Sequence, residues 1–197
     1  MSARRLYLVE YTAILLGVGL VGMLVLPFFA RARESDGPYG RCPSNIKQIG
    51  LVVAQYAADY NGFLPSVQGK GTMFGWADAL LPYTKTRYVF QCPAQVDRMQ
   101  DNPGSRGYTD YWFNARVAGH MLAGVSMPTQ TLLLGDGNDG TDVTDARYSL
   151  SSLPPAWKTD EKSPLFRHLG TANYVFADGH AKMFPAGAIT NSSRFRF

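Results

Sequence analysis

Residues 11–30, YTAILLGVGLVGMLVLPFFA, form an unbroken apolar run with a single carboxylate, Glu10, at its N-terminal edge. A helix over this run, at about 1.5 Å per residue, covers about 30 Å, which is the thickness of the hydrocarbon core of a bilayer. A cleaved signal peptide has a shorter apolar core and a small-x-small cleavage site, and a buried core helix carries polar residues at helical spacing. The run has neither pattern, so it predicts a single-pass membrane anchor.

Glu10 has two interpretations. It lies at the membrane interface and pairs with Arg4 or Arg5, or it is held at the membrane edge for a partner, because an ionisable group beside a membrane span is costly and often functional. Basic residues flank the run on both sides. Since long C-terminal domains cross the membrane largely regardless of charge, their count does not fix the orientation.

The chain after the anchor is long enough for one globular domain with its own core. Ser44 or Asn45 can cap a helix over residues 45–60, which Asn61-Gly62 ends, and a shorter helix is expected over 76–81. Asp178-Gly179 is a strong hairpin signal. The strands are expected at 88–91, 108–114, 131–134, 173–177 and 180–184, and residues 135–164 are expected to form a long polar loop. This order predicts an α+β fold in which the N-terminal helix packs on an antiparallel sheet.

The N-terminal segment RRLYLVEYTAILLGVGLVGMLVLPFFARARE resembles that of type IV pilin-like proteins, including the pseudopilins of type II secretion. That family has a short basic leader, a processing site, four apolar residues, a glutamate and a long apolar helix that tends to carry a proline 17 residues after the glutamate. Residues 6–9, Glu10 and Pro27 fill these positions. The family has glycine before the cleavage point, where this chain has Arg5.

The resemblance implies three parts of the chain: a leader over 1–5, a transmembrane helix over 6–35 and an extracytoplasmic globular domain over 36–197. It implies cleavage by a prepilin peptidase between Arg5 and Leu6, followed by methylation of the new N-terminus. It also implies that Glu10 neutralises the N-terminal amine of a neighbouring subunit during assembly. Arg5 is the one departure from the family pattern at the processing step.

The C-terminal stretch RHLGTANYVFADGHAKMF carries His168, nine intervening residues and then Asp178-Gly179. It resembles the H-X9-DG box (168–179) of the prepilin-type processing-associated domain. The segments CPSNIKQIGLVVAQYAADYNGFLP, WADALLPY, VFQCP and TLLLGDG are similar to the same group and occur in the same order. The resemblance therefore spans nearly the whole chain.

This family implies a pseudopilin: an inner-membrane, single-pass subunit with a periplasmic or extracellular C-terminal domain. Such a subunit assembles through its N-terminal helix, with other pilin-like subunits, into a type II secretion pseudopilus or a type IV pilus-like filament. The alternative is an anchored extracytoplasmic module that binds a ligand or glycan and never polymerises. Arg5 favours that alternative.

Cys42 and Cys92 are the two cysteines of the chain. Their spacing fits neither a zinc ribbon nor a CxxC redox pair. In an exported domain they can form a disulfide, and the other interpretation is two buried free thiols.

His168, Asp178 and His180 suit a zinc or other divalent ion by their chemistry. The favoured interpretation is a structural polar knot at the hairpin, in which His168 bonds Asp178 or a strand-end carbonyl.

The loop GDGNDGTDVTD supplies oxygen ligands of the kind that calcium prefers. It does not match an EF-hand, because Gly140 stands where a ligand belongs. The alternative is a solvated acidic loop. The candidate calcium ligands are Asp136, Asn138, Asp139 and Asp142.

Charge and motifs argue against two other classes of function. The net charge is +4, and no basic block or basic-aromatic stripe indicates nucleic-acid binding. The sequence contains no G-x-S-x-G elbow, P-loop or H-E-x-x-H motif. We therefore expect a protein that is not an enzyme and needs no cofactor other than the candidate calcium.

Overall fold

The computed structural model describes residues 10–23, 38–95, 100–140 and 142–189. The chain divides into two compact units, Met1–Gly37 and Pro38–Phe197. Arg5, Leu6 and Pro27, which the sequence singles out, lie outside the described residues. Among the described helices, none combines the length and the apolar character needed to cross a membrane.

In the first unit, residues 10–23 are helical, and Glu10 is the first described residue of that helix. Its large apolar side chains are all exposed, from 61% at Ile14 and Val21 to 78% at Met23. The apolar character extends around the whole helix, because the consecutive residues Ile14, Leu15 and Leu16 are all more than 60% exposed.

The second unit opens with helix α2, Pro38–Asp59. The helix begins earlier than residue 45, so the prediction that Ser44 or Asn45 caps it is wrong. Pro43 lies inside the helix and removes one backbone hydrogen bond near its start, while the side chain of Asn45 donates to the Gln91 carbonyl at 2.8 Å. The predicted end is confirmed: Asn61 and Gly62 both have positive φ, and the Gly62 N–H donates to the Ala57 carbonyl, as in a Schellman cap.

A five-stranded sheet follows, in the order β3-β1-β2-β4-β5. The strands are β1 (Tyr111–Asn114), β2 (Leu132–Asp136), β3 (Ser149–Leu150), β4 (Thr171–Phe176) and β5 (Ala181–Pro185). The fold class is therefore α+β as expected, but the sheet is mixed rather than antiparallel, because β3 pairs with β1 in parallel. Gly179, with φ 88°, forms the tight turn between β4 and β5 that Asp178-Gly179 predicted.

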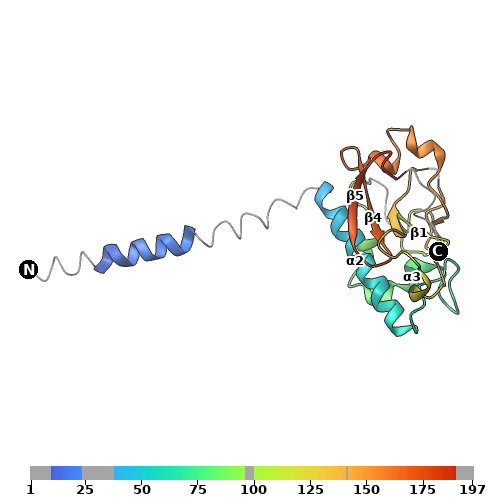
Figure 1. Ribbon diagram of the computed structural model, residues 1–197, viewed down its shortest axis with the longest axis horizontal. Helices are drawn as coiled ribbons and strands as arrows, with labels where there is room; N and C mark the ends of the chain where they lie inside the picture. The colour runs from blue at the N-terminus through green and yellow to red at the C-terminus, as the bar shows by residue number, and fades with distance from the viewer. Residues whose placement is uncertain (1–9, 24–37, 96–99, 141, 190–197) are drawn as a thin grey trace, which may run out of the picture. The chain divides into compact units, whose positions relative to one another are not determined.

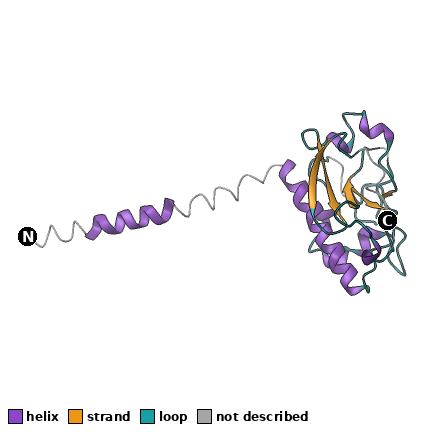
Figure 2. Ribbon diagram, viewed as in Figure 1, coloured by secondary structure: helices purple, strands orange, loops and turns teal. Residues whose placement is uncertain are grey.

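Both faces of the sheet are covered (Figures 1 and 2). Helix α2 packs against β2, β4 and β5, where Ile46 and Ile49 join Phe113 and Val175 in one core. The opposite face is covered by the segment that contains the short helices η4 (Pro155–Lys158) and η5 (Pro164–Phe166); a second core there is built around Trp112, Leu132, Tyr174, Phe176, Trp157 and Leu165. A register shift between Leu132 and Leu134 sends these two leucines to opposite cores, as a β-bulge does.

Two further predictions are corrected by these elements. Residues 88–91 do not form a strand: they overlap the 3-10 helix η2, Arg87–Phe90, in which Tyr88 is exposed while Val89 and Phe90 are both buried, so the two-residue alternation of a half-buried strand is missing. Residues 135–164 are not simply a polar loop, because β3 and η4 lie within them. The remaining short helices are α3 (Trp76–Ala79), η1 (Leu81–Tyr83) and η3 (Leu122–Gly124).

Candidate functional site

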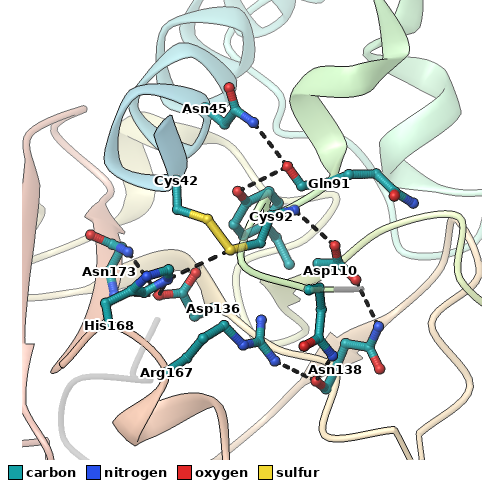
Figure 3. Close-up of a disulfide and its surroundings, with 12 residues drawn as sticks. Cys42, Asn45, Gln91, Cys92, Asp110, Asp136, Asn138, Arg167, His168 and Asn173 are labelled. Atoms are coloured by element: carbon teal, nitrogen blue, oxygen red, sulfur yellow. Dashed lines mark hydrogen bonds and ion pairs between the residues drawn. A yellow bond between two sulfur atoms is a disulfide. The ribbon is translucent and has the colours of Figure 1, made fainter. Parts of the chain in front are cut away.

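A disulfide joins Cys42, in the second turn of α2, to Cys92, just after η2, with a Cα–Cα distance of 5.2 Å. Both residues are fully buried. The bridge confirms the disulfide and excludes the alternative of two free thiols. It ties the start of α2 to the segment that follows η2 (Figure 3).

His168 and Asp136 lie directly beside this bridge. The Nε2 atom of His168 is 3.6 Å from the Cys92 sulfur and 3.2 Å from Oδ2 of Asp136. His168 is 5% exposed and Asp136 is fully buried. We call these four residues, Cys42, Cys92, Asp136 and His168, the disulfide–histidine cluster (Figure 3).

Local structure fixes each member of the cluster. Asp136 is the last residue of β2, and its Oδ2 accepts hydrogen bonds from the backbone N–H (2.6 Å) and the side-chain amide (2.9 Å) of Asn173 on β4. His168 sits in a tight turn before β4, in which its backbone N–H donates to the Thr171 carbonyl. The next residue, Leu169, has φ 55°, a conformation that L residues other than asparagine and aspartate seldom adopt.

A second polar group, centred on Asp110, holds the loop around the cluster in place. Its Oδ2 accepts from the Cys92 backbone N–H at 2.7 Å, and its Oδ1 accepts from the Asn138 amide at 2.7 Å. Arg167, the neighbour of His168, donates to the Asn138 carbonyl. Asp110 thus links the disulfide loop to the residues that follow β2.

Electrostatics at the site are those of a closed, poorly solvated interior. Burial raises the pKa of the Tyr111 hydroxyl well above its usual 10.0, and the carboxylates of Asp136 and Asp110 act in the same direction. Burial likewise raises the pKa of Tyr174, with Asp136 again contributing. Charges in such surroundings interact more strongly than in water.

The structure does not bring His168, Asp178 and His180 together. Asp178 contacts His180 at the β4–β5 turn, with 2.6 Å between Oδ1 and Nδ1, while His168 faces Asp136 and the disulfide. The expected bond from His168 to Asp178 is therefore wrong. His168 lies before β4 and Asp178 after it, so the length of the strand separates them.

The four candidate calcium ligands form hydrogen bonds with other residues, and the side-chain amide of Asn138 donates to Asp110. Asp136 binds Asn173, Asp139 accepts from the Trp157 indole at 3.0 Å, and Asp142 accepts from the Tyr148 hydroxyl at 2.8 Å. Asp139 and Asp142 also interact with each other, but among the described residues the three carboxylates do not form a group that could hold an ion. Burial raises the pKa of Asp142 above its usual 3.8, although the hydrogen bond from Tyr148 opposes that rise.

Three residues around the cluster were missed by reasoning from the sequence: Asp110, Asn173 and Arg167. Two of them carried a usable signal. Asp110 stands directly before the aromatic strand YWFN, and Asn173 interrupts the apolar strand TANYVF. A polar residue inside an otherwise buried strand needs a hydrogen-bond partner, which here is found on a neighbouring element.

Comparison of the chain with protein-family models, with curated proteins and with solved structures found no match.

Proposed function

We propose that this protein is a membrane-anchored, pilin-like subunit, a pseudopilin that assembles through its N-terminal helix into a type II secretion pseudopilus or a type IV pilus-like filament. The observation that carries the proposal is the helix over residues 10–23, whose apolar side chains are exposed all round. A helix of this kind is stable when lipid or other helices cover it.

Details of this helix support lateral packing as well as anchoring. Ala13 and Gly17 are spaced as a small-xxx-small pair, which allows the backbones of two helices to approach closely. Among the described residues, nothing lies within 4 Å of a Cβ added at Gly17. Glu10 is exposed at the edge of the apolar run, where it can face a cationic group on a neighbouring subunit.

The test replaces Glu10 by alanine in the full chain. In the same cells it measures the amount of protein in the membrane fraction and the yield of filaments. We expect the Glu10→Ala protein to stay in the membrane fraction, because the apolar run is intact, and to lose its filaments. Glu161→Ala is the matched control, since Glu161 is an exposed glutamate of the globular unit. Filaments of normal yield from Glu10→Ala would count decisively against the proposal.

A second candidate is the anchored module that binds a ligand or glycan without polymerising. A cleft of about 510 Å³ beside the start of α2 favours it, because its lining is uncharged and rich in amides, with Gln48, Gln91 and Gln95 around the exposed ring of Tyr88. Amides and an aromatic face suit a neutral, hydroxyl-rich ligand.

Mass spectrometry of the mature N-terminus separates the two candidates. A new N-terminus at Leu6, methylated or not, supports the filament subunit. An intact leader, combined with saturable binding of oligosaccharides that Tyr88→Ala abolishes, supports the anchored module.

A further inference from the structure

We propose that the disulfide–histidine cluster becomes a zinc site when its disulfide is reduced. The four ligands are the two cysteine sulfurs, Nε2 of His168 and a carboxylate oxygen of Asp136. In the disulfide form the same residues hold a covalent bridge, so the cluster has two mutually exclusive states, one for oxidising and one for reducing surroundings.

Ligand type is the first support. Zinc in proteins is bound by thiolate, imidazole and carboxylate groups, and sites with four protein ligands are structural. Cys42, Cys92 and His168 form a group whose ligand atoms lie within 4.8 Å of one another, and it is the one such group of three among the described residues. Asp136 lies outside this group but contacts Nε2 of His168 at 3.2 Å, and the proposal takes it as the fourth ligand.

Two observed distances match edges of a tetrahedron around zinc. Zinc lies about 2.3 Å from sulfur and about 2.0–2.1 Å from nitrogen and oxygen, which gives edges of about 3.6 Å between sulfur and nitrogen and about 3.3 Å between nitrogen and oxygen. The observed edges are 3.6 Å from the Cys92 sulfur to Nε2 of His168 and 3.2 Å from Nε2 to Asp136. The two sulfurs are too close, because they are bonded, and reduction removes that constraint. Asp136 does not lie within 4.8 Å of all three other ligand atoms, so its carboxylate has to move toward the sulfurs when zinc binds.

Unused hydrogen-bonding capacity in the cluster is a second, independent support. Oδ1 of Asp136 and Nδ1 of His168 are buried and have no hydrogen-bond partner within the described structure. Buried polar atoms of this kind are rare, and an ion or a water often accounts for them. Zinc bound to Oδ1 gives the Asp136 atom a partner, whereas Nδ1 of His168 carries the ring proton and is not a ligand, so this support rests on Asp136.

The chemistry balances with a dithiol as reductant. The dithiol gives two electrons and two protons to the Cys42–Cys92 bond and itself closes to a disulfide. Zinc then takes the place of the two thiol protons, which are released to solvent. His168 binds through the lone pair of Nε2, and its ring proton moves to Nδ1. Exchange back to the bridge requires an oxidant of the disulfide class and loss of the metal.

The test uses the full chain in detergent micelles and cobalt(II) as the spectroscopic probe for zinc. One sample keeps the disulfide; the other is reduced with a phosphine, and thiol labelling after denaturation verifies that two thiols are present. We expect one cobalt ion per reduced chain, with a thiolate-to-cobalt charge-transfer band that zinc abolishes, and no band from the disulfide form. A reduced, folded chain without the band overturns the proposal.

Variants identify the ligands. His168→Ala and Asp136→Ala should weaken cobalt binding by at least about tenfold, and Cys42→Ser with Cys92→Ser should abolish it. His180→Ala is the matched control, because His180 lies at the exposed β4–β5 turn, and it should bind cobalt normally. Equal binding by His168→Ala would refute the assignment.

A measurement on the unmutated chain covers the case in which these variants fail to fold. X-ray absorption at the zinc edge should count two sulfur and two nitrogen or oxygen neighbours in the reduced chain. Any other sulfur count, including four sulfurs shared between two chains, contradicts the site.

Discussion

Replacing Cys42 and Cys92 by alanine tests how much of the domain's stability depends on the bridge. The two residues are 50 positions apart, and closing a loop of that length removes about 14 cal/mol/K of entropy from the unfolded chain, or about 4 kcal/mol at 25 °C. Deleting the two buried sulfur atoms adds a packing loss of about 1 kcal/mol each, by analogy with the loss of single methylene groups. We expect the free energy of unfolding to fall by about 4–6 kcal/mol, a large part of the total for a domain of this size.

Urea unfolding followed by tryptophan fluorescence measures the change, since Trp76, Trp112 and Trp157 are all buried. Reduction of the unmutated chain in the presence of a chelator keeps the sulfur atoms and removes only the constraint. The difference between the reduced chain and the alanine variant therefore isolates the packing loss. The urea dependence should also steepen, because the unfolded chain without the bridge exposes more surface.

The control is the reduced chain after reoxidation, which should recover the original stability. A loss below about 1 kcal/mol with an unchanged urea dependence would refute the loop-entropy argument. It would mean that the unfolded state keeps residues 42 and 92 close together without the bridge.

For three further substitutions, the direction of the change in stability follows from the surroundings of a single residue. Gly50→Ala in α2 should lower the free energy of unfolding by about 1–2 kcal/mol in a urea titration, because the added Cβ would lie 2.7 Å from Val175 on β4 and overpacking outweighs the gain in helix propensity. The pKa of Asp142 is raised above 3.8 in the folded state, so the unfolded chain loses this proton first and stability declines as pH rises above about 3.8. Asp142→Asn should remove that decline. Tyr108→Phe should flatten the decline between pH 10 and 12, because burial raises the pKa of Tyr108 to about 12 and ionisation then favours the unfolded chain.

Each of these has a control. Gly17→Ala adds the same methyl group where, among the described residues, it meets nothing within 4 Å, and should leave the unfolding of the globular unit unchanged. Asp160→Asn and Tyr88→Phe change exposed residues of the same types and should leave both pH profiles as they are. A stabilised Gly50→Ala protein, or unaltered profiles for Asp142→Asn and Tyr108→Phe, would contradict the respective contact.

Local signals in the sequence were sufficient for the elements that local chemistry determines. Asn61-Gly62 marks the end of α2 because both residues adopt the positive φ that a helix cap needs. Asp178-Gly179 marks the hairpin because Gly179 adopts the positive φ of the tight turn. By contrast, β3 has two residues and pairs in parallel with β1. Nothing in so short a segment distinguishes it from a loop.

Most of the cluster beside the disulfide could not be predicted from the sequence, because its members are brought together by the fold. Asp136 looked like one of several loop carboxylates, yet it is the buried last residue of β2. The sequence motif points to His168 and suggests Asp178, the next conspicuous residue of the same motif, as its partner. The partner, Asp136, comes from the neighbouring strand β2, which pairs with β4 in antiparallel fashion. The register that places Asp136 beside His168 depends on how β2 and β4 pair, and neither segment alone predicts it.

The position of the bridge has a mechanical consequence. The globular unit begins at Pro38, so a pull transmitted along the chain from the N-terminal side enters the unit only four residues before Cys42. From there the force passes through the sulfur–sulfur bond to Cys92, and the enclosed residues, including the rest of α2, carry no tension. Forced extension of the intact protein should therefore lack the contour length of this enclosed loop, about 170 Å at about 3.4 Å per residue. The start of α2 is tethered covalently at the point where load arrives.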